Sequence, residues 1–149
     1  MPEEPTLVSP DQVRLVVETD VIGVIRLINA TLPLLRRSAS PRIVNTSSGV
    51  GSLARQSATT GELTTGPISG AYSPSKTFLN AVTVQYAKEL TDTNILINLA
   101  CPGFVATDLN GFRGVRSPEQ GAAIAIRLAT LPDDGPTGGY FEDAGTIPW

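Results

Sequence analysis

Two side chains of the sequence have the types and the spacing that proton transfer needs. Tyr72 and Lys76 lie four residues apart in the segment YSPSK, and residues at that spacing project from the same face of a helix. A nearby cation lowers the pKa of a phenol because it favours the phenolate, so Tyr72 can donate or accept a proton near neutral pH. Taken alone, the pair is better explained as a surface tyrosine beside a solvated lysine.

Polar residues also follow two predicted strands. Ser48 stands where an apolar strand gives way to a glycine-containing turn, and ligands of parallel sheets bind at this edge. A hydroxyl group there can donate a hydrogen bond to a substrate carbonyl oxygen and stabilise the charge that develops on it. Thr107 follows the next strand and its Pro102-Gly103 turn, where it can hydrogen-bond a planar amide. Alone, Ser48 is better explained as satisfying the turn backbone, and Pro102-Gly103 as an ordinary strand-to-loop turn.

The elements that must position these residues alternate between helix and strand. Ser9 before Pro10, and Ser117 before Pro118, are typical of helix starts, and we expect Pro33 to kink or shorten the first helix. Helices are predicted over residues 11–36, 71–90 and 117–131, strands over 42–47, 94–100 and 138–142, and loops over 52–70 and 103–116. Helices that alternate with short apolar strands indicate an α/β fold with a parallel sheet and helical crossovers.

Composition excludes several classes of function. The 149 residues carry a net charge of −3, with 11 Lys and Arg against 14 Asp and Glu, which argues against nucleic-acid binding. The chain has no histidine, so Ser-His-Asp catalysis and His-ligated metal sites are excluded. Its single cysteine, Cys101, forms neither an internal disulfide nor a Cys-rich zinc site, which predicts a reducing cytoplasm. No stretch of about 18 apolar residues predicts a membrane span, and the first ten residues do not form a signal peptide.

Taken together, these residues resemble the short-chain dehydrogenase/reductase family, and within it the bacterial relatives of the carbonyl reductases. The resemblance implies the C-terminal part of a Rossmann-type doubly wound parallel sheet, with about three strands and three helices. It also implies NAD(P)-dependent reduction of a small carbonyl compound or oxidation of an alcohol. The matching residues occur in the family's order: Ser48 with Gly51, Tyr72 with Lys76, and Asn98 with Pro102, Gly103 and Thr107.

The resemblance also assigns a role to each residue. Tyr72 is implied to be the general acid or base that exchanges a proton with the substrate oxygen. Lys76 is implied to lower the pKa of Tyr72 and to hold the nicotinamide ribose, and Ser48 to orient and polarise the carbonyl group. Thr107 and the Pro102-Gly103 backbone would face the nicotinamide carboxamide, and the resemblance favours NADP over NAD.

The sequence departs from the family pattern at Asp20, where the family usually has a catalytic asparagine. We hypothesise that Asp20 pairs with Lys76, which would stabilise the lysine ammonium but weaken its help to Tyr72; an exposed helix aspartate is an equal alternative. The Ser/Thr-rich segment between Ser48 and Tyr72 suggests an enlarged loop beside the substrate pocket. In the loop 108–116, Leu109 and Phe112 can face an apolar carbonyl compound or simply belong to a solvated loop.

A larger departure concerns the dinucleotide-binding half of the family fold. The sequence contains no Gly-rich turn of the Thr-Gly-x-x-x-Gly-x-Gly type, which would hold the cofactor pyrophosphate. We therefore expect residues 1–149 to form a single partial Rossmann-type domain that carries the catalytic half and is inactive alone, with an unpaired edge on the strand at 42–47. Helices 11–36 and 71–91 match the pair through which relatives dimerise, so a homodimer is expected. The alternative is a non-catalytic oligomerising protein derived from this family.

Overall fold

A four-stranded sheet forms the centre of the chain in a computed structural model, which describes residues 4–57 and 68–149. The strands follow the order β1-β2-β3-β4, and the first three run parallel. Strand β4 pairs antiparallel with β3 in a short hairpin. The strands are β1 (Arg42–Thr46), β2 (Leu96–Ala100), β3 (Tyr140–Glu142) and β4 (Gly145–Thr146). This α/β arrangement confirms the predicted fold class and adds the β4 hairpin, which the sequence did not predict.

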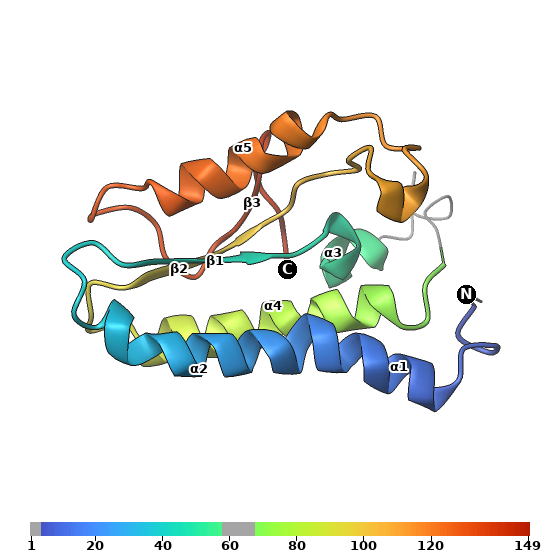
Figure 1. Cartoon of the computed structure of the whole chain (residues 1–149), viewed down its shortest axis with the longest axis horizontal. Coiled ribbons are helices and arrows are strands. Elements are labelled where there is room, and N and C mark those ends of the chain that lie inside the picture. Colours follow the sequence, from blue (N-terminus) through green and yellow to red (C-terminus); the bar gives the residue numbers. More distant parts are fainter. Residues whose placement is uncertain (1–3, 58–67) are drawn as a thin grey trace.

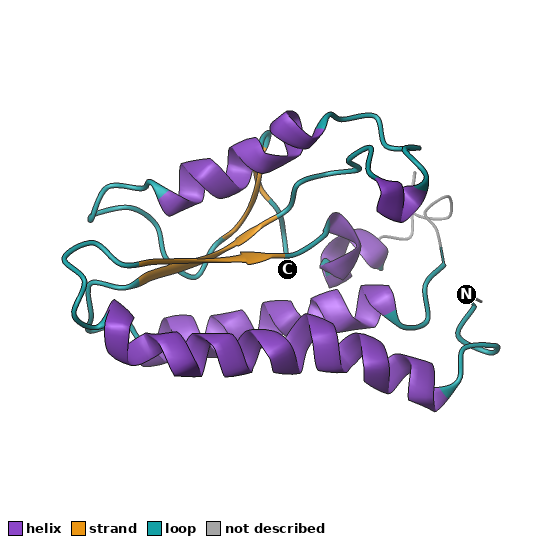
Figure 2. Ribbon diagram, in the orientation of Figure 1, coloured by secondary structure: helices purple, strands orange, loops and turns teal. Residues whose placement is uncertain are grey.

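Helices cover both faces of this sheet (Figures 1 and 2). The consecutive helices α1 and α2 lie beside α4 on one face, and α5 lies on the other. Both crossovers between parallel strands are therefore helical, as expected for this class of fold. The helices are α1 (Pro10–Val17), α2 (Gly23–Leu35), α3 (Leu53–Gln56), α4 (Tyr72–Glu89) and α5 (Pro118–Ala129).

The sequence signals for two helix starts are confirmed by side-chain caps. The Ser9 hydroxyl accepts a hydrogen bond from the backbone N–H of Gln12 at the start of α1. The Ser117 hydroxyl does the same for the backbone N–H of Gln120 at the start of α5. Each glutamine side chain also accepts a hydrogen bond from the backbone N–H of its serine, which completes a capping box.

The predicted helix over 11–36 differs from the structure in its middle. Residues Glu18–Ile22 form a π-helical turn, η1, between α1 and α2, and the Gly23 N–H donates to the carbonyl of Glu18. Such turns have the same apolar pattern as an α-helix over a short stretch, so the sequence does not distinguish them. Pro33 lies inside α2, which continues to Leu35, so it does not end the helix early.

The predicted loop over 52–70 was wrong in its first part. Residues Leu53–Gln56 form the short helix α3, because the Ser52 hydroxyl caps it by accepting from the Arg55 N–H. Residues 58–67 of that loop lie outside the described residues. The loop over 103–116 contains a 3-10 turn, η4 (Asp108–Asn110), that the sequence did not predict.

Apolar side chains pack on both faces of β2, whose five residues are all buried. On the face covered by α1, α2 and α4, Leu79 contacts a cluster that includes Val21 and Leu99. On the opposite face, Ala100 packs with Ile124 and Leu128 of α5. The alternation of burial along β2 is lost because helices cover both of its sides, as the continuous apolar run predicts.

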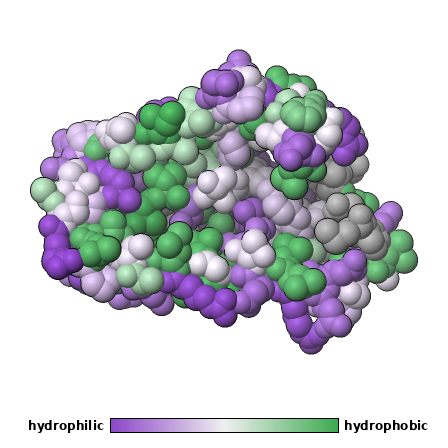
Figure 3. All heavy atoms as spheres, in the orientation of Figure 1, coloured by the Kyte–Doolittle hydropathy of each residue, from purple (hydrophilic) through white to green (hydrophobic). Residues whose placement is uncertain are grey.

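Strand β1 pairs with β2 alone among the strands of the described residues, so its other edge is free. Beside this edge lies a groove of about 550 Å³ between β1 and the helix α2. Val24, Leu27 and Ile28 line it from the helix, and Asp20 and Lys76 lie at its polar end. Figure 3 shows hydrophobic side chains gathered on the face that includes this edge. The unpaired edge expected from the sequence is thus present in the described part of the chain.

Within residues 4–57 and 68–149, no helix has the length and apolar character that crossing a membrane requires.

Leu79 packs between α4 and the sheet in a cluster with Val21 and Leu99, and it is 1% exposed. We expect Leu79→Ala to lower the free energy of unfolding by about 2–5 kcal/mol, since it removes apolar contacts and leaves a cavity. Urea denaturation followed by circular dichroism measures this change. Leu109→Ala is the matched control, because Leu109 is 94% exposed and its loss changes stability by about 0.5 kcal/mol or less. Equal effects of the two substitutions would contradict the packing described here.

Candidate active site

The first turn of α4 brings Tyr72 and Lys76 together, as their spacing predicts. The Lys76 Nζ atom lies 5.5 Å from the centre of the Tyr72 ring. It also donates a hydrogen bond of 3.2 Å to the backbone carbonyl of Thr46, the last residue of β1. The Lys76 side chain is 12% exposed. This geometry fixes the ammonium between the sheet edge and the phenol, so Lys76 is not a solvated surface lysine, whereas Tyr72 is 44% exposed.

Ser48 follows β1 directly and precedes the 3-10 turn η2 (Gly49–Gly51). Its side chain lies close enough to the Tyr72 phenol to favour the phenolate. Its backbone carbonyl accepts a hydrogen bond from the hydroxyl of the buried Tyr140. The backbone of Ser48 is therefore held by a residue of β3, and its hydroxyl lowers the pKa of Tyr72.

A buried polar network supports the Ser48 turn from below, and sequence reasoning missed it. The Ser47 hydroxyl donates to Asn80 Oδ1 at 2.6 Å. Asn80 Nδ2 in turn donates to the backbone carbonyl of Gly51 at 3.1 Å. Ser47 and Asn80 are both buried, and buried polar groups of this kind are stable only when they are hydrogen-bonded. The spacing of Asn80 four residues after Lys76 on α4 was the available signal.

The aromatic ring of Tyr140 also contacts the end of the described chain. The ring centres of Tyr140 and Trp149 are 5.9 Å apart, a separation typical of interacting aromatic pairs. Burial raises the pKa of Tyr140 to about 12, and the Ser47 and Asn80 side chains act in the opposite direction. The Tyr140 hydroxyl therefore stays protonated at neutral pH and remains a hydrogen-bond donor to Ser48.

The structure pairs Asp20 with Lys76, as the sequence hypothesis states. Asp20 lies in the π turn η1, and its Oδ2 atom is 3.6 Å from Lys76 Nζ. The Asp20 side chain is 20% exposed, so the alternative of an exposed helix aspartate is wrong. The Ser75 hydroxyl lies 2.8 Å from the same carboxylate oxygen, a contact that the sequence did not predict.

The pKa of Tyr72 is raised above its ordinary value, whereas the sequence predicts that Lys76 lowers it. Partial burial of the phenol is the main cause, because it disfavours the charged form. The Ser48 hydroxyl lowers the pKa, while the negative charge of Asp20 raises it further. Asp20 thus opposes the stabilisation of the phenolate that a nearby lysine alone would provide.

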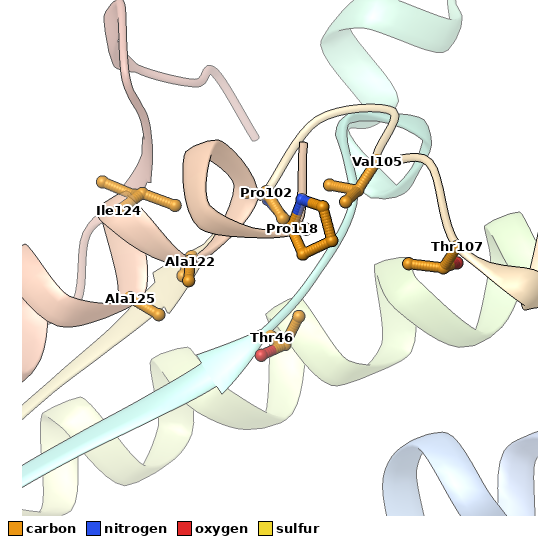
Figure 4. Close-up of a pocket in the computed structure, with 10 residues that line it drawn as sticks. Thr46, Pro102, Val105, Thr107, Pro118, Ala122, Ile124 and Ala125 are labelled. Atoms are coloured by element: carbon orange, nitrogen blue, oxygen red, sulfur yellow. The ribbon is translucent and has the colours of Figure 1, made fainter. Parts of the chain in front are cut away.

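Pro102 and Thr107 line a cavity of about 300 Å³ at the carboxyl end of β1 and β2 (Figure 4). Thr46 lies at its base, and Ala122 and Ala125 of α5 form one wall. Thr46 is also the residue whose carbonyl binds Lys76, so the cavity adjoins the lysine. Pro102 and Thr107 thus lie at the same edge of the sheet as the carbonyl that binds Lys76.

The cavity combines apolar walls with a few polar groups at its border. Its walls are mainly apolar and suit the face of a planar ring, and Thr46 and Thr107 add polar groups at its border. Its volume lies at the lower end of the range for small-molecule pockets. Gly103 is in the left-handed conformation with φ of 75°, and a Cβ atom there would lie 2.7 Å from Arg116 Cδ. A side chain at this position would therefore be strained and would collide with the side chain of Arg116.

Leu109 and Phe112 lie outside the cavity. They are 94% and 69% exposed, respectively, and neither lines it. The expectation that these two side chains face a bound apolar compound is therefore not met in this conformation, and the alternative of a solvated loop describes it better.

Comparison with known proteins identifies the family of this chain. The sequence profile described as short chain dehydrogenase matches residues 3–116. The chain belongs to the short-chain dehydrogenase family. In this member, Lys76 lies 5.5 Å from the centre of the Tyr72 ring and 3.6 Å from Asp20 Oδ2.

Three relatives illustrate the similarity. Short-chain dehydrogenase/reductase 1 of Saponaria officinalis is 36% identical, over 83% of this chain and 51% of its own length. Carbonyl reductase [NADPH] 1 of Rattus norvegicus is 36% identical over 53% of this chain and 31% of its own. The structure of carbonyl reductase Sniffer of D. melanogaster superposes with a TM-score of 0.78 and 28% identity, covering 97% of this chain and 60% of that one. The chain spans about half the length of the first relatives it matches.

Gly51 is the position where the Ser48 turn approaches α4 most closely. A Cβ atom there would lie 2.9 Å from both the Cβ and the carbonyl carbon of Lys76. We therefore expect Gly51→Ala to push the turn from the helix and to lower the free energy of unfolding by about 1–3 kcal/mol. Denaturant unfolding measures the change.

Gly23→Ala is the matched control for this substitution. A Cβ atom at Gly23 would meet its nearest neighbour at an ordinary 3.4 Å, and alanine favours the helix by up to about 1 kcal/mol. A Gly51→Ala protein as stable as the Gly23→Ala protein would show that the approach is not tight.

Proposed function

We propose that this chain is the catalytic portion of an NAD(P)-dependent oxidoreductase that reduces a small carbonyl compound or oxidises the corresponding alcohol. The observation that carries this proposal is the contact of Lys76 with the Tyr72 ring and with the carbonyl of Thr46, a residue that lines the cavity beside Pro102 and Thr107. The phenol can exchange a proton with a substrate oxygen, and the serine can hydrogen-bond the same oxygen. This set of groups suits the conversion of a carbonyl group to an alcohol.

In the reduction direction, the Tyr72 hydroxyl donates its proton to the carbonyl oxygen as that oxygen becomes an alcohol. The Ser48 hydroxyl hydrogen-bonds the same oxygen and stabilises the negative charge that develops on it. The Lys76 ammonium stays within reach of the phenol and stabilises it after the proton has left. The nicotinamide cofactor, when bound, supplies the hydride. In the oxidation direction, Tyr72 accepts the proton of the alcohol.

The proposed cofactor is NADP, with NAD as the alternative. The cavity beside Thr46, Pro102 and Thr107 would hold the nicotinamide ring, and Tyr72 and Lys76 would hold the ribose. The name of the rat relative includes NADPH, which supports the choice of NADP. Because the 149 residues contain no Gly-rich turn for the pyrophosphate, we propose that this chain alone binds the cofactor weakly.

A titration of NADPH fluorescence with the purified chain tests this proposal. We expect weak, saturable binding that Lys76→Ala weakens by about tenfold, because hydrogen bonds from a charged donor are lost. Lys88→Ala is the matched control, since Lys88 is the other lysine of the chain and lies in the last turn of α4. A folded chain without saturable binding, or equal affinity of the two variants, would overturn the proposal.

The second candidate function is a non-catalytic oligomerising protein of the same family. The observation that favours it is the set of large apolar side chains that remain exposed on α1, α2 and α4, namely Leu15, Leu27, Leu34 and Phe78. Exposed apolar side chains of this kind are typical of interaction surfaces. A homodimer through the helices over 11–36 and 71–91 is compatible with both candidates, and the NADPH titration distinguishes them.

We propose this homodimer in solution and expect sedimentation analysis to find it. Leu15→Glu together with Phe78→Glu should yield a monomer, because two charges would have to be buried at the interface. Ile126→Glu is the control, because Ile126 is similarly exposed but lies on α5, across the sheet. A monomer of the unaltered chain at high concentration would contradict the proposed dimer.

A further inference from the structure

The carboxylate of Asp20 is held against Lys76 by two features of the fold. The first is the π turn, which places Asp20 opposite the first turn of α4. The second is Ser75, whose hydroxyl group is fully buried and lies 2.8 Å from Asp20 Oδ2. Because Ser75 directly precedes Lys76 in the chain, it connects the carboxylate to the helical turn that carries the lysine.

The Ser75 hydroxyl also lies near the other member of the pair. It is 2.7 Å from the backbone carbonyl of Tyr72 and thus stands between two acceptors, with one proton to donate. The carboxylate, the serine and the first turn of α4 form one hydrogen-bonded unit. Movement of Asp20 from Lys76 would therefore break a buried contact.

The Lys76 ammonium therefore interacts with three groups at once. Its Nζ atom lies 3.2 Å from the carbonyl of Thr46, 3.6 Å from Asp20 and 5.5 Å from the centre of the Tyr72 ring. A cation that is paired with a carboxylate stabilises a neighbouring phenolate less than a free cation does. The neutral phenol is the form that donates a proton.

We propose that Asp20, aimed by the hydroxyl of Ser75, is a positioning residue that pairs with Lys76 and keeps Tyr72 in its protonated, proton-donating form. The inference rests on the proposed function for its consequence, which is that the site favours carbonyl reduction over alcohol oxidation near neutral pH. The charge arrangement itself depends only on the contacts described above.

Among residues 4–57 and 68–149, the groups that surround Tyr72 come from several elements. Lys76 faces it from α4, Asp20 from the π turn, Ser48 from the turn after β1, and the buried Cys101 from the end of β2. Asp20 is the acidic side chain among them, and its charge contributes to the raised pKa of Tyr72. Removal of that charge should therefore make the phenol easier to ionise.

A spectrophotometric titration of tyrosine ionisation tests the proposal without cofactor or substrate. The chain has three tyrosines, so the difference between each protein and its Tyr72→Phe counterpart isolates the absorbance change of Tyr72. We expect Asp20→Asn to move the Tyr72 midpoint to lower pH by up to about one pH unit. Ser75→Ala should move it in the same direction by a smaller amount, because the carboxylate remains but is no longer held.

Two control variants separate charge from general perturbation. Asp11→Asn removes another acidic side chain, which pairs with Arg14 on the exposed surface of α1, and should leave the midpoint unchanged. Asp20→Glu keeps the charge and should retain a midpoint near that of the unaltered chain. Circular dichroism over the titration range confirms that each protein is folded. If the Asp20→Asn protein does not fold, Asp20→Ser takes its place.

An unchanged or higher Tyr72 midpoint in folded Asp20→Asn overturns the proposal, and an unchanged midpoint in Ser75→Ala overturns the part assigned to Ser75. These outcomes are independent of the proposed function. Failure of NADPH to bind would overturn the oxidoreductase activity and leave the titration result standing. Intact NADPH binding with an unchanged midpoint would overturn only the role of Asp20.

Discussion

The close approach of helix α4 to the turn after β1 is the contact on which the candidate site depends. At Gly51 the turn comes so near to α4 that a side chain would overlap Lys76. Two polar side chains of the helix, Thr77 and Asn80, hydrogen-bond the Gly51 carbonyl and hold the turn at that distance. Ser48 is thereby placed at a fixed position relative to Tyr72 and Lys76. A site of three side chains from two elements needs such a rigid contact, because small displacements have large effects on proton transfer.

Several polar side chains are buried between β1 and α4, below the candidate site. Asn45 donates to the hydroxyl of Thr83 between β1 and α4, and Ser47 donates to Asn80 one turn nearer the site. Unpaired, each of these buried groups would destabilise the fold by about 1–3 kcal/mol. Because each finds a partner only when β1 and α4 are in register, the pairs restrict how the helix can slide along the sheet. The same register sets the position of Lys76.

Local sequence signals predicted the parts of the fold that depend on local interactions. Ser9 and Ser117 determine helix starts through contacts with residues three positions ahead, and the Tyr72 and Lys76 spacing follows from helical periodicity. The apolar runs at β1 and β2 predicted buried strands. The pairing of Asp20 with Lys76 could be hypothesised because the residue type departs from the family pattern.

The features that sequence reasoning missed depend on contacts between distant residues. Helix α3 starts at Ser52, whose hydroxyl also donates to the carbonyl of Pro148 near the end of the described chain. The contact of Ser75 with Asp20 spans 55 positions in the sequence. The π turn differs from an α-helix in that each hydrogen bond spans five residues instead of four, and a short apolar pattern does not distinguish the two. The sequence predicted the wrong direction for the Tyr72 pKa for the same reason. Partial burial of the phenol and Asp20, which is distant in the sequence, raise this pKa, and a prediction from the neighbouring Lys76 alone includes neither of them.

The contact between the rings of Tyr140 and Trp149 provides an intrinsic fluorescent probe near the candidate site. Trp149 is the single tryptophan of the chain, and its ring lies against the tyrosine whose hydroxyl holds the Ser48 carbonyl. Indole emission responds to the polarity and motion of its immediate surroundings. Any event that displaces the turn carrying Ser48 therefore changes the fluorescence of one residue, with no second indole to obscure it. Conformational changes at the candidate site can therefore be measured without an added label, from the emission wavelength of Trp149.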